Sequence, residues 1–268
     1  MATELQLWAL ILGSSSGFGE ATAIELARSG MNIFGVHFDR RATMPHVEEI
    51  QSRIRALGRE PVFFNANAVD EEKRKEIIEA IRRRCSDPAA PGTVRVLLHS
   101  IAFGALLPFV SRDAAEKTAT KAQLEMTADT MAHSLVYWVQ DLVRAGLMTR
   151  GGRIYAMTSA GGTRAIPQYG PVSGAKALLE SHIRQLALEL APFGITANAI
   201  RAGVTDTPSS RKIPGSDKLF EFAAMRNPHG RLTTPEDVAK CIAVLAHENT
   251  YWMTGNTIGV DGGEDIVA

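Results

Sequence analysis

Residues 7–30 read LWALILGSSSGFGEATAIELARSG, and this stretch decides the fold. Its first six residues are all apolar, which predicts a short strand buried on both faces. Beyond the glycine-rich segment 13–19, apolar residues recur at helical spacing over 20–29, and Gly30 is a typical helix stop. A strand, a glycine-rich turn and a helix in this order predict the first unit of a parallel sheet.

The same alternation continues along the rest of the chain. Strands are predicted over 32–38, 61–65, 94–99, 153–157, 195–200 and 257–260, and helices over 47–57, 71–84, within 118–148, over 172–191 and after Thr234. Thr234, Pro235 and Asp237 have the spacing of a capped helix start. No linker, repeat or low-complexity segment interrupts the pattern. We therefore expect one α/β domain over residues 1–268, with helices on both faces of a parallel sheet.

The composition excludes several classes of protein. Lys and Arg total 29, Asp and Glu total 29, and the zero net charge argues against a protein that binds nucleic acid. No stretch approaches the roughly 18 apolar residues that cross a bilayer, and residues 1–12 lack the features of a secretory signal. Cys85 and Cys241 are expected to be reduced thiols. These features predict a cytoplasmic protein that interacts with neither membrane nor nucleic acid.

The glycine-rich segment is the first candidate site. Its glycines permit a tight turn and let the backbone approach a pyrophosphate, which then lies at the N-terminus of the next helix. The candidate contacts are Gly13, Ser15, Ser16, Gly17, Phe18 and Gly19. The alternative is a purely structural turn, since a glycine-rich loop alone is a weak signal.

Tyr169 and Lys176 form the second candidate site. They are seven positions apart at the start of a predicted helix, nearly two turns, so both side chains project from one face. A nearby ammonium is expected to lower the pKa of the phenol, which then donates a proton to a developing oxyanion near neutral pH. The alternative is an ordinary surface pair.

With these motifs the chain resembles the short-chain dehydrogenase/reductase family. The resemblance rests on 13–19, on Tyr169 and Lys176, on 202–207 (AGVTDT) and on 261–263 (DGG), in this order along almost the whole chain. It implies a single doubly wound Rossmann-type domain with a seven-stranded parallel sheet, and a homo-oligomer, either a tetramer or a dimer. It also implies nucleotide contacts at Asn67, Ala68, Ser100, Ile101, Ala102, Gly203, Val204, Thr205 and Thr207, with Tyr169 and Lys176 beside them.

Three departures from the usual family pattern are informative. The fourth strand ends in His99-Ser100-Ile101-Ala102 instead of Asn-Asn-Ala-Gly, and 131–135 (MAHSL) lacks the Asn typical of carbonyl reducers. Ser159 lies only ten positions before Tyr169, whereas the family's catalytic serine usually lies about thirteen before. These segments, with 164–169 (RAIPQY), resemble enoyl-acyl-carrier-protein reductases. The ordinary glycine loop and Ser159 make the chain most similar to the NADPH-using subtype of bacilli.

The end of the second predicted strand bears on the cofactor. His37 occupies the strand-end position, and Arg40 and Arg41 are within reach of a 2′-phosphate. We therefore expect NADPH. Asp39 keeps NADH possible, because an acid there would bind the ribose diol. The alternative for both arginines is an ordinary solvated charge.

The resemblance implies reduction of a trans-2-enoyl thioester, carried by acyl carrier protein or a small molecule, in fatty acid synthesis. Tyr169 would stabilise the enolate oxygen, Lys176 would hold the nicotinamide ribose, and Ser159 or Thr158 would assist. For Ser159, capping the next turn is an equal alternative. Reduction of 3-oxoacyl thioesters or other ketones remains open, as does a non-catalytic NADP(H)-binding protein.

Two apolar segments are expected near the substrate, although ordinary helix packing is the competing interpretation. They contribute Ile213, Leu219, Phe220, Phe222 and Met225 from the flap 208–229, and Phe103, Leu106 and Leu107 after the fourth strand. No metal site is expected, because His46, His182, His229 and His247 lack ligand spacing.

Overall fold

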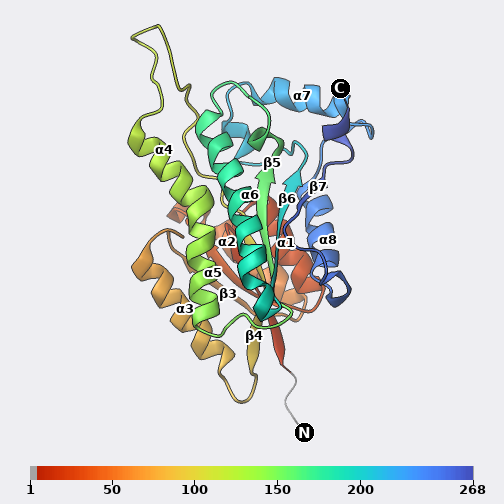
Figure 1. Cartoon of the computed structure of the whole chain (residues 1–268). Coiled ribbons are helices and arrows are strands. Elements are labelled where there is room, and N and C mark those ends of the chain that lie inside the picture. Colours follow the sequence, from red (N-terminus) through yellow and green to blue (C-terminus); the bar gives the residue numbers. More distant parts are fainter. Residues whose placement is uncertain (1–4, 268) are drawn as a thin grey trace.

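The predicted strands pair in the order β3-β2-β1-β4-β5-β6-β7, and every pairing is parallel. This computed structural model describes residues 5–267, so residues 1–4 and 268 of the predicted domain lie outside it. Within that range, seven strands build the sheet (Figure 1). They are β1 (Gln6–Leu12), β2 (Asn32–His37), β3 (Pro61–Asn65), β4 (Gly92–His99), β5 (Arg153–Ser159), β6 (Thr196–Ala202) and β7 (Thr257–Val260).

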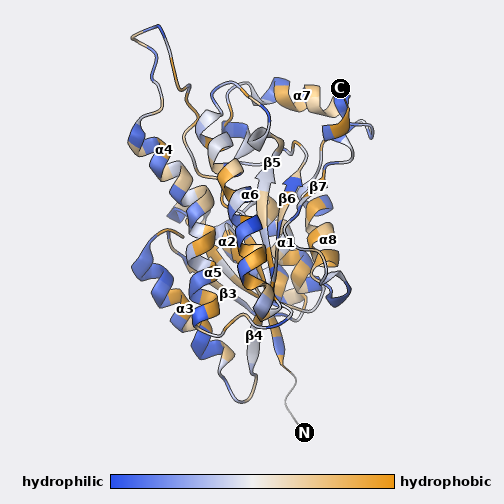
Figure 2. Cartoon of the chain, viewed as in Figure 1, coloured by the Kyte–Doolittle hydropathy of each residue, from blue (hydrophilic) through white to orange (hydrophobic). Residues whose placement is uncertain are grey.

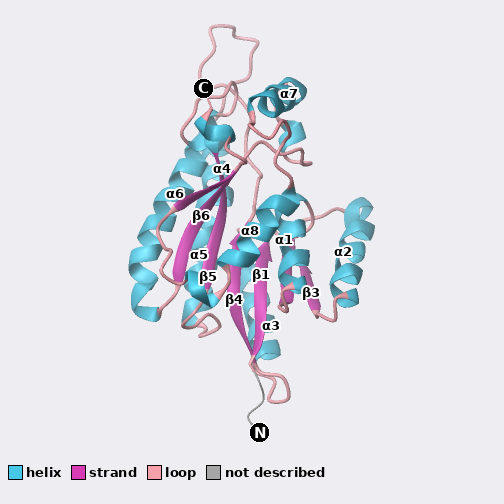
Figure 3. Cartoon of the chain, turned by 90° about the vertical axis from the view of Figure 1, so that its right-hand side faces the viewer, coloured by secondary structure: helices cyan, strands magenta, loops and turns pink. Residues whose placement is uncertain are grey.

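Helices cover both faces of the sheet, as Figures 1 and 3 show from two directions. One face carries α3 (Glu71–Cys85), α5 (Ser134–Arg144) and α6 (Gly170–Leu190), with α4 (Lys121–Ala128) continuing α5. The other face carries α1 (Gly17–Arg28), α2 (Met44–Ala56) and α8 (Pro235–Leu245). This is the doubly wound Rossmann-type arrangement that was predicted.

The alternation of side chains along β1 explains why its sequence is continuously apolar. Trp8, Leu10 and Leu12 pack into the cluster under α3, α5 and α6. Ala9 and Ile11 point to the opposite cluster under α1, α2 and α8. Because a strand in the middle of such a sheet is buried on both faces, it has no solvent-facing position for polar residues. By contrast, α3 lies on the outside of the molecule and is mostly hydrophilic, as Figure 2 shows.

The strand order places a crevice at the end of β1. The chain moves outward from β1 to β3 and then returns to β4 on the other side of β1. Ligands of open α/β sheets bind at such a switch point, outside the carboxyl ends of the strands. The glycine-rich segment 13–19 and residues 100–102 follow β1 and β4 and therefore meet there.

The structure differs from the predicted elements in two places. The helix expected within 118–148 is two helices, α4 and α5, joined by a π-helical turn at Asp129–His133. The flap 208–229 contains a further helix, α7 (Ser216–Arg226), which lies beyond the carboxyl edge of the sheet (Figure 1). The predicted cap of α8 is confirmed, because Thr234 and Asp237 exchange hydrogen bonds between side chain and backbone N–H.

Residues 100–120 connect β4 to α4 without regular structure, and this connection projects from the same end of the molecule as α7 (Figure 1). The connection 100–120 and the segment that carries α7 thus both lie at the carboxyl end of the sheet (Figure 1). None of the helices in residues 5–267 is long and apolar enough to span a membrane.

Candidate active site

The glycine loop fits tightly between two neighbouring strand ends. A Cβ atom added to Gly13, whose φ is +88°, would lie 2.4 Å from the Ser100 carbonyl oxygen. One added to Gly19 would lie 1.9 Å from the Gly13 oxygen, and one added to Gly17 would meet the Thr207 methyl at 3.3 Å. Side chains are therefore excluded here, and the loop after β1 touches the segments that follow β4 and β6.

The other loop residues leave the start of α1 accessible. Ser16 precedes α1 in an extended conformation, and its side chain makes no capping hydrogen bond. The N-terminal N–H groups of this helix of 12 residues thus keep their capacity to bind an anion. Ser15 is half-buried, and Phe18 packs against the core under α1. The residues fit a dinucleotide pyrophosphate.

At the end of β2, an acid faces the glycine loop. The Asp39 carboxylate accepts a hydrogen bond from Thr43 Oγ1 at 2.7 Å and pairs with His37 Nδ1 at 3.0 Å. Burial alone would raise the pKa of Asp39, but hydrogen bonds from Ser15, Thr43 and His37 outweigh it and hold the pKa below its ordinary value. Asp39 is therefore ionised at neutral pH.

The other predicted cofactor contacts that follow β2 and β3 differ in burial and in their hydrogen bonds. Burial lowers the pKa of His37, so its ring is neutral at pH 7. Arg40 and Arg41 are exposed, and neither forms an ion pair with the residues that the structure describes. Asn67 is exposed and its side chain accepts a hydrogen bond from the Val69 N–H, which fixes the turn after β3.

Two further predicted contact segments follow β3 and β4. The buried Ala68 accepts a hydrogen bond from Trp138 Nε1 at 2.9 Å through its carbonyl oxygen. Ser100 donates its N–H to Leu12 at 2.8 Å, while Ile101 is half-buried and Ala102 exposed. The Ser100 contact holds the segment after β4 next to the glycine loop, and the Trp138 contact fixes the turn after β3 against α5.

The segment after β6 is anchored by an acid that the sequence analysis did not identify. Glu264 is buried and accepts a hydrogen bond from the Val204 N–H at 2.9 Å. A Cβ atom on Gly203 would lie 2.9 Å from the same carboxylate. Thr205 turns its hydroxyl back to the Gly203 carbonyl at 3.0 Å. Only the folded chain reveals Glu264, because it lies 60 residues beyond its partner.

Tyr169 immediately precedes α6 and is buried in a small apolar cluster. Its ring packs with Met131, Val172 and Ala175, and the half-buried Leu106, Ile166 and Ile213 cover this cluster. A Cβ atom on Gly161 would lie 2.5 Å from the ring, so the short turn after β5 packs directly on the phenol. Gln168, one residue earlier, has a φ of +61°, a strained conformation of the kind found at functional sites.

Lys176 lies two turns further along α6 and is also buried. Its Nζ donates a hydrogen bond to the Met157 carbonyl oxygen at 2.6 Å. Burial lowers the pKa of Lys176 to about 8, and the charge of Glu180 opposes this shift. Thr158 Oγ1 donates to the Glu180 carboxylate at 2.7 Å.

The structure contradicts the expectation that the ammonium of Lys176 lowers the pKa of Tyr169. Burial raises the pKa of Tyr169 above its ordinary value, and a hydrogen bond with Ser159 opposes the rise. The charge of Lys176 is not among the causes of this shift, and its ammonium donates a hydrogen bond to the Met157 carbonyl oxygen. Desolvation in the apolar cluster dominates, and it favours the neutral phenol, which is the proton-donating form.

The two hydroxyls that end β5 have different surroundings. Thr158 is bound to Glu180, so it does not assist at the same oxygen as Tyr169. Ser159 lies next to Tyr169 and also accepts a hydrogen bond from the Gly161 N–H at 3.1 Å. Both interpretations of Ser159, the cap and the partner of the phenol, are therefore compatible in one structure.

Only some of the apolar residues expected near the substrate lie near Tyr169. Ile213 and Leu106 pack against its cluster. Phe222 and Met225 of α7 and Phe103 are exposed, at 56%, 72% and 62%. The half-buried Leu219, Phe220 and Leu107 lie outside the cluster.

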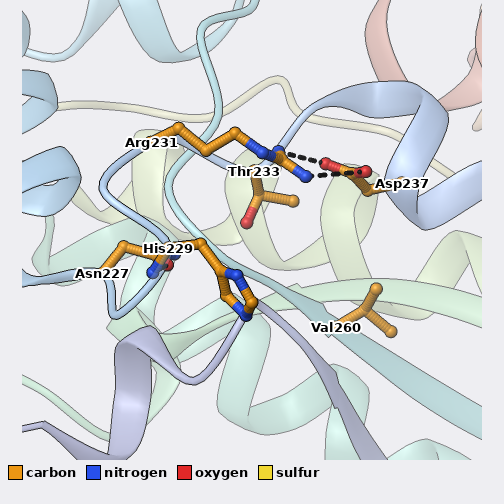
Figure 4. A pocket seen from close by; sticks show the side chains of 7 residues that line it. Asn227, His229, Arg231, Thr233, Asp237 and Val260 are labelled. Atoms are coloured by element: carbon orange, nitrogen blue, oxygen red, sulfur yellow. Dashed lines mark hydrogen bonds and ion pairs between the residues drawn. The ribbon is translucent and has the colours of Figure 1, made fainter.

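A pocket of about 200 Å³ lies between the segment before α8 and the end of β7, and its lining residue Thr233 adjoins Gly203 (Figure 4). Its lining includes Asn227, His229 and Thr233, and the ion pair of Arg231 with Asp237 lies across it. None of the predicted site residues lines it. Within residues 5–267, no cluster of three or more His, Cys, Asp or Glu side chains is arranged to hold a metal ion.

Known proteins resemble this chain over almost its whole length. A family model described as enoyl-(acyl carrier protein) reductase matches residues 13–264. The 1-cyclohexenylcarbonyl-CoA reductase of Streptomyces collinus is 29% identical over 266 residues, covering 97% of this chain and 87% of that protein. The 3-oxoacyl-[acyl-carrier-protein] reductase FabG of Thermotoga maritima is 26% identical over 254 residues, covering 95% and 96%.

A solved structure shows the same fold. The enoyl-acyl carrier protein reductase of Bacillus cereus, with NADP+ and indole naphthyridinone, has a TM-score of 0.86 at 24% identity, covering 98% of this chain and 97% of that chain. At this identity the likeness concerns the fold alone. The match of the family model over nearly the whole chain carries the assignment. The chain belongs to the enoyl-(acyl carrier protein) reductase family of short-chain dehydrogenases/reductases and is an oxidoreductase.

Proposed function

We propose that this protein reduces the 2,3 double bond of trans-2-enoyl thioesters. The observation that carries the proposal is the surroundings of Tyr169. Its hydroxyl, with Ser159 beside it, is the polar group of an otherwise apolar cluster that the flap residue Ile213 helps to cover. Such a site suits an acyl chain with one oxygen to be stabilised.

The glycine loop and the residues around it are suited to hold a nicotinamide dinucleotide, which supplies a hydride when bound. Addition of a hydride to the β-carbon moves electrons onto the thioester oxygen, giving an enolate. The neutral Tyr169 hydroxyl donates a hydrogen bond to that oxygen, and a proton taken up at the α-carbon completes the reduction. In this proposal Lys176 would hold the hydroxyls of the nicotinamide ribose. One preorganised donor of this kind contributes about 3 kcal/mol.

Enoyl reduction is favoured over ketone reduction by the segment 131–135. Carbonyl-reducing relatives of the resembled family carry an Asn there for proton relay. Here Ser134 occupies the stretch, and its hydroxyl is bound to the Thr130 carbonyl at 2.8 Å. An enolate needs stabilisation of its oxygen, whereas an alkoxide must receive a proton that is then replaced from solvent. A site without the relay Asn suits the first task better.

For the cofactor, we propose NADH in preference to NADPH, which reverses the expectation drawn from Arg40 and Arg41. The ionised Asp39 is the charged side chain that faces Ser15 of the glycine loop, whereas both arginines point into solvent. A carboxylate at this place accepts hydrogen bonds from a ribose diol and repels a 2′-phosphate. We expect Asp39→Ser to raise kcat/KM for NADPH relative to NADH at least about tenfold. An unchanged ratio would contradict this.

The activity test follows the absorbance of the reduced cofactor with crotonyl and acetoacetyl thioesters in parallel. We expect oxidation with the crotonyl thioester, and a loss of about 10²-fold in kcat for Tyr169→Phe with cofactor affinity retained. Oxidation with acetoacetyl thioester alone would overturn the proposal in favour of a ketone reductase. Cofactor binding without any oxidation would point to the non-catalytic alternative. By family resemblance we place the reaction in cytoplasmic fatty acid synthesis.

A further inference from the structure

His99, the last residue of β4, is fully buried beneath the site. Its Nε2 lies 2.8 Å from Ser134 Oγ, and that hydroxyl donates its own hydrogen to the Thr130 carbonyl at 2.8 Å. Because Ser134 has a single hydrogen, it must accept from His99 Nε2–H. This contact fixes the tautomer, and Nδ1 is left as an acceptor.

The acceptor at Nδ1 is buried and has no hydrogen-bond partner among residues 5–267. Burial and the charge of Lys176 lower the pKa of His99 to about 3, and an interaction of the ring with its own backbone opposes this shift only in part, so the ring stays neutral. An unmatched buried acceptor costs free energy and is uncommon in folded proteins. The lone pair on His99 Nδ1 is therefore fixed in orientation and has no hydrogen-bond donor among the described residues.

The ammonium of Lys176 has more N–H donors than the described residues supply acceptors. Its ammonium carries three N–H donors, and the Met157 carbonyl is the acceptor that the described residues supply. His99 pairs with Ala156 across β4 and β5, so the imidazole and the acceptor of Lys176 stand next to each other on the sheet. A buried charge requires most of its donors to be matched.

We propose that His99 is a positioning residue for Lys176: its Nδ1 accepts a hydrogen bond from one buried water, which in turn accepts a hydrogen bond from the ammonium. The π-helical turn Asp129–His133 and Ser134 hold the imidazole for this purpose. One N–H of Lys176 binds Met157, one binds the water that donates to His99, and the third remains for the ribose. The role of Lys176 in turnover rests on the proposed function, whereas the contact itself does not.

The proposal fixes the sign of a measurable effect. A neutral acceptor stabilises the protonated amine, so removal of His99 lowers the proton affinity of Lys176. Besides His99, the titratable group whose charge acts on the ammonium is Glu180 on α6. The charge of Glu180 raises the pKa of Lys176, as His99 is proposed to do, and Glu180 is retained in all the variants.

The first test uses the wild-type protein and is independent of activity. ¹⁵N NMR of labelled histidines should show His99 as the Nε2–H tautomer, with Nδ1 shifted as for a hydrogen-bond acceptor. In Lys176→Met this Nδ1 signal should move toward the value of a free acceptor. A reversed tautomer, or an Nδ1 signal that is unaffected by Lys176→Met, would overturn the proposal.

The second test uses variants of His99. In His99→Leu, ¹³Cε NMR of lysine should place the pKa of Lys176 about one unit lower, a tenfold loss of proton affinity. His99→Asn retains an acceptor and should restore most of it. Leu98→Val is the matched control, since Leu98 is equally buried but packs on the opposite face of the sheet. If the pKa of Lys176 is unchanged in a folded His99→Leu protein, the proposed contact is refuted.

Turnover separates this proposal from the proposed function. The alkaline limb of the pH–kcat profile should move down in His99→Leu and return in His99→Asn, with the cofactor KM nearly constant. Should Lys176 titrate as expected while neither thioester is reduced, the contact stands and the enoyl reductase assignment fails. If His99→Leu does not fold, the wild-type NMR experiment and His99→Asn still decide.

Discussion

At the scale of single residues, Gly161 is the closest support of the phenol. An added methyl group would lie 2.5 Å from the Tyr169 ring, inside van der Waals contact, so Gly161→Ala must displace the ring or the turn. We expect kcat to fall at least about tenfold while the dissociation constant of the cofactor is unchanged. Gly174→Ala, on α6 with open space around its Cα, is the control. Equal turnover in both variants would contradict the packing argument.

Lys176 makes stability depend on pH in a predictable direction. Its pKa is about 8 in the folded protein and near 10.5 in an unfolded chain. Between these values the unfolded state binds more protons, so the free energy of unfolding rises with pH, and below pH 8 the full cost of the buried charge applies. Relative to Lys176→Met, the wild type should gain up to about 3 kcal/mol between pH 7.5 and 10.5. Urea unfolding at several pH values measures this gain. The prediction is contradicted if the free energies of unfolding of the wild type and Lys176→Met change with pH in parallel.

At the scale of elements, α7 is a helix with little buried surface. Of its residues, all of which the structure describes, only Ala223 is buried, while Phe222 and Met225 are exposed. We expect this helix to exchange its amide hydrogens quickly and to become protected when cofactor and an acyl thioester are both bound, because the acyl chain then covers its apolar face. Hydrogen–deuterium exchange mass spectrometry tests this with α8 as the internal reference. Unchanged exchange in α7 would argue against a flap.

The π-helical turn between α4 and α5 shows why one predicted helix became two. The apolar spacing within 118–148 is helical throughout, so the sequence pattern has no break. The widened turn at Asp129–His133 instead accommodates contacts with other parts of the chain, such as that between Ser134 and His99. A π-helical turn is often found at a functional site for this reason.

At the scale of the whole molecule, two strongly exposed apolar residues support the predicted homo-oligomer. Leu188 on α6 is 70% exposed and Trp252 is 86% exposed. Light scattering should give a mass that is a multiple of 29.0 kDa, and Leu188→Glu should shift it toward the monomer because it places a charge in an apolar contact. Val110→Glu, at an 82% exposed position in the β4–α4 connection, is the control. A wild-type monomer would contradict the prediction.

The single domain over 1–268 stays a prediction. The seven-stranded sheet within residues 5–267 is continuous, and both core clusters extend across it, which is what one cooperative unfolding transition requires.

The sequence by itself determined the alternation of strands and helices, because burial on one or two faces leaves a periodic pattern in local sequence. The strands at 61–65 and 257–260 have the predicted bounds, and the α8 cap follows from residues three apart. Only the tertiary structure decided that Asp39 faces the glycine loop, that desolvation sets the pKa of Tyr169, and that His99 meets Ser134. These features depend on contacts between distant segments, which no local pattern records.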